Sequence, residues 1–156
     1  MRPLYYISWT PIALVAATPK TILELPTPAN TSLTIIEFFP GIDVTSAGSL
    51  KIEWGIYGTT SAGATAATPQ KWLGDRNIDS AVVSAKVNTS ATEPAGFSQG
   101  TLGAALYPGA LLPLPCIPYF PWPLAQEFDV PESTNFGIRL TSSVAGNTMG
   151  WIKWTE

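Results

Sequence analysis

The sequence contains no histidine and a single cysteine, and these two shortages restrict its chemistry. Without histidine the chain lacks the most common general base and metal ligand of enzymes. Cys116 has no imidazole partner to activate it as a nucleophile, and one cysteine cannot form an intramolecular disulfide. The composition therefore predicts a protein without catalytic activity, cofactor or bound metal. It fits a reducing compartment or indifference to redox state.

Charged residues are also scarce. They make up 12% of the chain, against about 25% in an average soluble domain. Eight basic and eleven acidic residues give a net charge of −3, and the basic residues form no run. This distribution argues against binding to the phosphate backbone of a nucleic acid, which requires clustered lysine and arginine. A surface with so few charges is typical of one covered by partner subunits.

Long apolar runs are missing as well. No stretch approaches the ~20 residues that a membrane helix requires, so no membrane partner is expected. Near the N-terminus, Ser8, Thr10 and Pro11 interrupt the apolar residues, which argues against a cleaved signal peptide. Residues 1–20 are instead interpreted as an extended N-terminal arm leading into a first strand. Residues 21–156 are expected to form one domain.

Proline, glycine, threonine and short apolar runs are abundant, and this pattern is typical of β-structure. Prolines recur too often in the first quarter of the chain for a long helix. Strands are predicted at Thr21–Leu25, Leu33–Phe39 and Leu50–Tyr57, the last with apolar residues at every second position. Asn135–Thr141 and Gly150–Trp154 are predicted to pair as a hairpin. The fold class expected is all-β, a single jelly-roll-like β-sandwich with an N-terminal arm.

Several residues offer chemistry that could serve a function or only the fold. Five carboxylates lie near predicted loops: Asp43, Asp75, Asp79, Asp129 and Glu132. A pair of carboxylates can hydrolyse glycosides, whereas carboxylates in loops more often cap turns. Six tryptophans could line a carbohydrate groove, or they could belong to the core or to an interface.

Two segments are candidate surfaces for partner proteins. The first is an apolar cluster at the N-terminus, where chains usually fray unless a partner orders them. The second is Tyr107–Leu124, where six prolines alternate with large apolar residues and remove backbone donors from any sheet. The alternative for this second segment is a lid over the protein's own core. The candidate contact residues are Tyr5, Tyr6, Ile7 and Trp9 in the first segment, and Leu111, Leu112, Ile117, Tyr119, Phe120 and Trp122 in the second.

Three parts of the sequence resemble tailed-bacteriophage virion proteins. They are AATPKTILELPTPAN at residues 16–30, IEWGIYGTTSAG with TAATP at residues 52–69, and FGIRLT with GWIKWTE at residues 136–156. The strings occur in the same order and cover most of the chain. The proline-rich segment at residues 107–124 departs from the pattern, which leaves its role open.

This resemblance implies a β-sandwich that serves as a structural protein of the virion, of the decoration or cement type. Such a protein would form a homo-trimer, bind the major capsid protein where capsomers meet, and brace the head from the capsid surface. It would be made in the host cytoplasm, and the family offers no catalytic residues. Two alternatives remain open: a tail or fibre component with receptor or carbohydrate binding, and a secreted carbohydrate-binding module.

Overall fold

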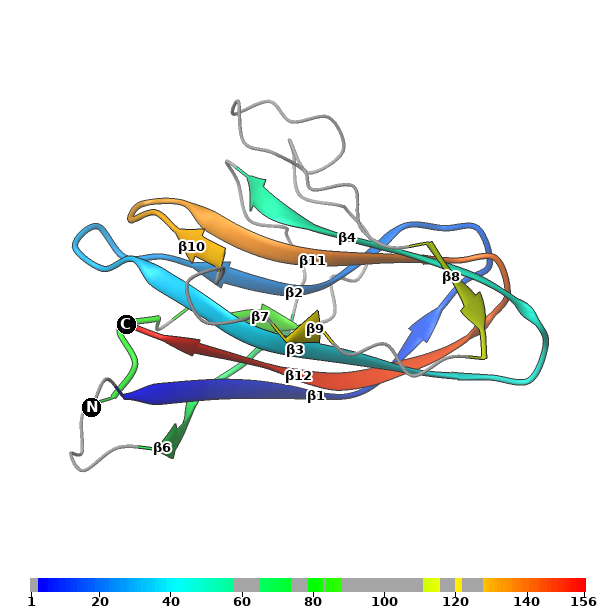
Figure 1. Ribbon diagram of the computed structural model, residues 1–156, viewed down its shortest axis with the longest axis horizontal. Coiled ribbons are helices and arrows are strands. Elements are labelled where there is room, and N and C mark those ends of the chain that lie inside the picture. The colour runs from blue at the N-terminus through cyan, green and yellow to red at the C-terminus, as the bar shows by residue number, and fades with distance from the viewer. Residues whose placement is uncertain are drawn as a thin grey trace.

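In the computed structural model, the regular secondary structure of the described residues consists of β-strands (Figure 1). The described residues are 3–57, 65–73, 79–82, 84–87, 111–115, 120–121 and 128–156. Within these ranges the chain forms twelve strands and no helix, so the prediction of an all-β protein is confirmed. No helix in the described part could therefore cross a membrane.

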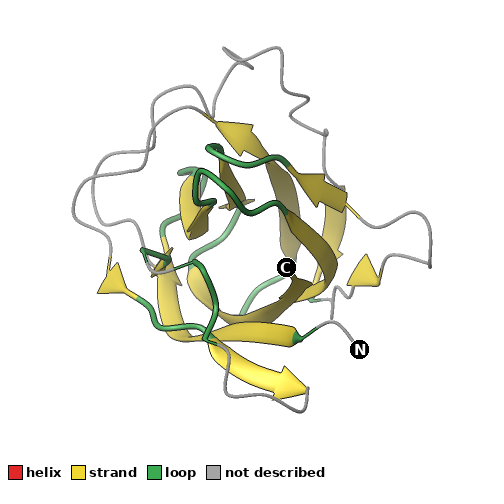
Figure 2. Ribbon diagram, turned by 90° about the vertical axis from the view of Figure 1, so that its left-hand side faces the viewer, coloured by secondary structure: helices red, strands yellow, loops and turns green. Residues whose placement is uncertain are grey.

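The strands form two antiparallel sheets. Sheet A runs in the order β10 (Phe128–Val130), β3 (Leu33–Val44), β12 (Gly146–Thr155), β1 (Leu4–Leu14) and β6 (Gln70–Leu73), and β9 (Phe120–Pro121) also pairs with β3. Sheet B runs in the order β5 (Thr65–Ala66), β7 (Lys86–Val87), β2 (Lys20–Pro26), β11 (Asn135–Ser142), β4 (Gly48–Tyr57) and β8 (Leu111–Leu114). The two sheets pack together as a β-sandwich, as Figure 2 shows from one end.

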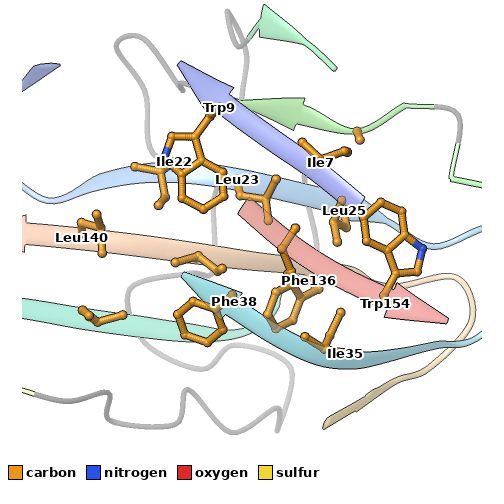
Figure 3. Close-up of a cluster of buried hydrophobic side chains, with 14 of the residues drawn as sticks. Ile7, Trp9, Ile22, Leu23, Leu25, Ile35, Phe38, Phe136, Leu140 and Trp154 are labelled. Atoms are coloured by element: carbon orange, nitrogen blue, oxygen red, sulfur yellow. The ribbon is translucent and has the colours of Figure 1, made fainter. Parts of the chain in front are cut away.

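The core lies between the sheets and is built by alternation along the strands. In a strand, every second side chain points to the same face, so each long strand contributes one row of apolar residues to the interior. The bulkiest fully buried residues include Trp154 and Phe38 from sheet A and Phe136 from sheet B. Figure 3 shows these side chains filling the space between the two layers. Tyr5 joins the cluster, with its ring centroid 6.1 Å from that of Trp154.

The N-terminal segment is part of sheet A, which corrects the expectation of an extended arm. Strand β1 pairs with β12 from Leu4 opposite Thr155 to Leu14 opposite Gly146. Its other edge pairs with β6. The apolar cluster alternates along the strand, and burying one face of it between the sheets removes more apolar surface from water than an arm would.

The expected C-terminal hairpin is also wrong, although both of its strands exist. Strand β11 pairs with β2 and β4 in sheet B, while β12 pairs with β1 and β3 in sheet A. The turn between them therefore carries the chain from one layer to the other. Both strands have a strongly apolar face, and placing these faces opposite each other across the core buries both of them.

A buried threonine ties two turns together at one end of the sandwich. The hydroxyl of Thr27 donates a hydrogen bond to a backbone carbonyl, with those of Pro131 and Thr134 lying 2.7 and 2.8 Å away. The same oxygen accepts a bond from the backbone N–H of Thr134 at 2.8 Å. These contacts link the end of β2 to the connection between β10 and β11. Thr27 is buried, and the loss of its hydroxyl would leave the backbone N–H of Thr134 without this partner.

Candidate functional site

The structure separates the four N-terminal contact candidates into two groups. Tyr5, Ile7 and Trp9 point into the core and are almost completely buried, so they are not available to a partner. Tyr6 lies on the opposite face of β1 and is partly exposed. The period of two along the strand produces this split, and only Tyr6 remains a candidate for surface contact.

The second group of candidates falls only partly within the described residues. Leu111 and Phe120 belong to strands β8 and β9, and Leu112 is half-buried against the core. Its neighbour Leu114 is buried in the core itself. The described part of this segment thus contributes to the protein's own interior at β8. The remaining candidates lie outside the described residues: Ile117, Tyr119 and Trp122.

The outer face of sheet A carries a row of aromatic and polar side chains. On adjacent strands, Tyr6 lies opposite Lys153, and Ser8 lies opposite Trp151. Residues that face each other across an antiparallel pair have neighbouring side chains on the same face of the sheet. These four residues therefore form a compact group on β1 and β12. Because both strands are central in sheet A, the backbone beneath this group is held on both sides.

The neighbouring strands extend the group in both directions. On one side, β3 places Glu37 opposite Lys153 and Phe39 opposite Trp151. On the other side, β6 supplies Trp72, two residues along the strand from Gln70, which is paired with Tyr6. The row thus crosses four strands that are far apart in sequence but adjacent in the sheet.

A lysine lies at the centre of this row. The ammonium group of Lys153 donates a hydrogen bond to Oε1 of Glu37 at 2.7 Å. It also lies 4.1 Å from the ring centroid of Trp72 and 4.5 Å from that of Trp151. Both members of the ion pair are largely buried, with side-chain exposures of 15% and 16%. Cation–π contacts of this kind contribute from about 0.5 to 2 kcal/mol each, depending on desolvation.

Ring packing holds the aromatic groups in place. Tyr6 meets Trp72 edge to face, with the centroids 5.3 Å apart and the planes at 87°. Phe39 stacks on Trp151 with the centroids 6.0 Å apart and the planes at 24°. Both arrangements are favourable for aromatic quadrupoles. The rings are thus oriented by contacts within the protein.

These side chains surround an open hollow of about 220 Å³, which we call the aromatic hollow. It is lined by Tyr6, Ser8, Trp72, Trp151 and Lys153. Trp72 is 56% exposed, although tryptophan is usually highly buried. The arrangement combines apolar rings, two hydroxyl groups and one neutralised ion pair. Such a site is suited to binding a small ligand or a surface group of a partner.

Of the residues that line this hollow, only Tyr6 is among the individual contact candidates predicted from the sequence, and Trp72 and Trp151 are covered only by the general expectation for the six tryptophans. The alternation at the C-terminal strand could have placed Trp151 and Lys153 on one face, opposite the buried Ile152. No local signal connects Trp72 with them. Its strand is short, and its place beside β1 depends on a pairing between distant segments.

The outer face of sheet B carries a buried ion pair. Nε of Arg139 donates a hydrogen bond to Glu53 at 3.0 Å, and Lys51 lies 2.8 Å from the other carboxylate oxygen. Burial raises the pKa of Glu53, but the hydrogen bonds from Arg139 and Lys51 outweigh this effect. As a result, the pKa lies below its ordinary value. The pair is satisfied internally and has the properties of a structural contact.

A third polar cluster closes one end of the sandwich. Glu156 accepts hydrogen bonds from the Ser80 hydroxyl, from the Ala81 backbone N–H at 2.8 Å and from Trp154 Nε1 at 3.1 Å. Burial, followed by the charges of Glu156 and Asp79, raises the pKa of Tyr5. The carboxylate of Glu156 thus fastens the segment around Ser80 to the end of β12.

The loop carboxylates do not assemble into a metal site in the described part of the chain. No group of three or more histidine, cysteine, aspartate or glutamate residues occurs there. Asp129 accepts a hydrogen bond from the hydroxyl of Thr34 at 2.8 Å, and Asp43 and Glu132 are exposed. Asp79 lines a second, polar hollow of about 310 Å³, while Asp75 lies outside the described residues.

No protein-family model, curated protein or solved structure matches the chain.

Proposed function

We propose that this chain is a structural virion protein that binds between neighbouring major capsid subunits and stabilises a phage head. In this proposal it acts as a homo-trimeric decoration protein on the capsid surface. The proposal combines the likeness of three sequence segments to phage virion proteins with the order in which the strands pair.

The strand order is the observation that carries the proposal. Eight strands make up the body of the sandwich in chain order: β1, β2, β3, β4, β8, β10, β11 and β12. Among these, the first pairs with the last, the second with the seventh, the third with the sixth and the fourth with the fifth. A long hairpin rolled into two layers has this nested order, which supports a jelly roll. Jelly rolls are used by viral capsid proteins and by lectins.

The edges of the sheets bear on how such a protein would assemble. In sheet A the edge strands β6 and β10 have four and three residues, and in sheet B the edge strands β5 and β8 have two and four. Strand β8 also contains Pro113, which cannot donate a ladder hydrogen bond. Short edges with proline resist the addition of foreign strands. Contact with capsid subunits would therefore use faces and loops.

The exposed surface supports contact with proteins. Large apolar side chains are exposed at Val15, Trp72 and Met149, and the chain has few charges to keep these regions solvated. Stable interfaces between subunits bury at least about 1,000 Å² and are depleted of charged residues at their centre. A trimer on a capsid would cover part of such a neutral surface.

The decisive experiment separates virions that carry this chain into heads and tails and quantifies the chain in each fraction by mass spectrometry. We expect it with the heads, in a copy number that is a multiple of three. In a second assay, purified protein is added to heads that lack it, and the temperature of DNA release is measured with an intercalating dye. Rebinding should raise this temperature, whereas an unrelated β-sandwich protein of similar charge should not. Recovery with the tails would contradict the proposal.

A further inference from the structure

We propose that the aromatic hollow on sheet A is a binding site for a neutral saccharide, with Trp72 as its stacking platform. The hollow would accommodate one pyranose ring, and a longer glycan would extend beyond it into solvent. This inference does not depend on the chain being a capsid protein, because it rests on the chemistry of five side chains.

The hollow matches the two surfaces of a sugar. A pyranose ring has an apolar face of C–H groups and a rim of hydroxyl groups. Trp72, Tyr6 and Trp151 offer aromatic surface to the C–H face, and the hydroxyls of Tyr6 and Ser8 lie among them with the Lys153 ammonium. Binding sites for small polar ligands commonly combine an apolar lining with a few placed polar groups.

The polar groups of the aromatic hollow have hydrogen-bonding capacity that the protein itself does not use. In the described part of the chain, the side-chain hydroxyls of Tyr6 and Ser8 have no protein hydrogen-bond partner. An ammonium group has three donors, and the bond from Lys153 to Glu37 engages one of them. Each of the two hydroxyls can both donate and accept, so together they offer about four hydrogen bonds to ligand hydroxyls. The rest of the Lys153 ammonium lies against the rings of Trp72 and Trp151.

The charge balance selects against acidic ligands. Glu37 lies 2.7 Å from the ammonium of Lys153, so the pair is neutral as a unit. A carboxylate or phosphate entering the hollow would have to compete with Glu37 for Lys153 and would be repelled by it. A neutral hexose or N-acetylhexosamine meets no such repulsion.

The site is formed before any ligand arrives. Tyr6 and Lys153 are paired across β1 and β12, and Trp72 is held by its contacts with both of them. A ligand would order few side chains on binding, so little conformational entropy is lost. Trp72 is exposed without filling the core, which leaves ring surface for a ligand.

The test uses saturation-transfer NMR, in which signals of the free sugar report contact with the protein. The probes are glucose, galactose, mannose and N-acetylglucosamine, each alone and as a β-linked trisaccharide, at millimolar concentration. We expect at least one probe to bind the full chain. The variant Trp72→Ala should weaken that probe by about tenfold or more, since it removes the stacking surface. Tyr6→Phe keeps the ring and loses the hydroxyl, and it should weaken binding about threefold or more.

The matched control is Met149→Ala, which removes an exposed apolar side chain from the outer face of sheet A without touching the hollow. It should bind the probe like the original protein. Far-UV circular dichroism and melting temperature establish that each variant is folded. If Trp72→Ala does not fold, Trp72→Phe and Tyr6→Phe carry the test.

Three results would overturn the proposal. The first is no saturation transfer from any probe, and the second is unchanged affinity in the Tyr6 and Trp72 variants. The third is a combination of two results: the original protein binds no saccharide, and Trp72→Ala no longer binds heads. The hollow would then be a contact site for another protein. Conversely, a chain that binds sugar but is recovered with tails would refute the capsid proposal and leave this one intact.

Discussion

Replacing Gly150 with alanine provides the sharpest test of the packing between the three central strands of sheet A. Gly150 lies in β12, opposite Trp9 of β1 on one side and Pro40 of β3 on the other. A Cβ atom there would lie 1.9 Å from the backbone oxygen of Phe39 and 2.6 Å from Cζ2 of Trp9. Carbon and oxygen atoms in contact are normally about 3.3 Å apart or more. The added methyl group would therefore overlap the backbone of β3 by more than an ångström.

Neither neighbour can move away cheaply. The Phe39 oxygen belongs to a strand held by β12 on one edge and by β9 and β10 on the other, and the Trp9 ring is buried in the core. Overpacking a well-filled interior costs about 1–3 kcal/mol, and more where backbone must shift. We expect Gly150→Ala to lower the free energy of unfolding by at least about 3 kcal/mol. For a chain of this length, that loss lowers the melting temperature by about 6–12 °C.

The assay is urea and thermal unfolding followed by far-UV circular dichroism and tryptophan fluorescence. All samples should have one protein concentration, because the melting temperature of an oligomer depends on it. Gly41→Ala is the matched control. Its Cβ atom would lie 3.0 Å from the Met149 oxygen and 3.1 Å from a ring carbon of Phe39, which is tight but can be relieved by small shifts. It should cost less than half as much as Gly150→Ala. Equal losses, or a Gly150→Ala protein within about 1 kcal/mol of the original, would refute the packing described here.

Two further predictions concern polar contacts. Burial raises the pKa of Glu53, but the hydrogen bonds with Arg139 and a neighbouring lysine outweigh this effect and lower the pKa below 4.5. The ionised carboxylate therefore stabilises the fold above pH 4.5, and this stabilisation is lost as the pH falls through the lowered pKa. Glu53→Gln breaks this buried ion pair, so it should lower the free energy of unfolding by about 3 kcal/mol at neutral pH and lose less further stability on acidification than the original protein. An equal fall in stability of the two proteins on acidification, measured by urea unfolding, would contradict this. Thr27→Ala should lower the free energy of unfolding by about 1–3 kcal/mol, because it leaves the backbone N–H of Thr134 unsatisfied. The control is Thr18→Ala at an exposed position, and equal stability of the two variants would count against the network around Thr27.

Several strands could be predicted from the sequence because alternation is a local property. The predicted strands at Leu33–Phe39 and Leu50–Tyr57 lie within β3 and β4. Thr21–Leu25 lies within β2. In β3 the buried residues largely alternate with less buried ones, whereas in β2 five consecutive residues from Thr21 to Leu25 are buried. Proline and glycine were poorer guides to where strands end, because β3 continues through Pro40 and Gly41 to Val44.

The N-terminal strand shows how a correct pattern can be misread. Tyr5, Ile7 and Trp9 alternate as in any half-buried strand, but together with Tyr6 they also form an apolar cluster near the N-terminus. This cluster was interpreted as an arm that binds a partner. The pairing with β12 shows instead that one face of β1 lies in the core and the other lies at the surface. For the same reason, Tyr6 is the only one of the four N-terminal contact candidates that remains available to a partner.

Local patterns were enough to predict the all-β class and the strands β2, β3 and β4, because proline frequency and a period of two act over a few residues. The absence of histidine is likewise a property of the sequence, and it holds whatever the fold is. Two features became known only from the pairing of distant strands: β11 and β12 lie in different sheets, and Trp72 lies beside Tyr6 and Lys153. Strand partners are chosen by contacts between segments far apart in the chain, where the gain from burying complementary faces exceeds the entropy of closing long loops. No local sequence pattern predicts which strands pair.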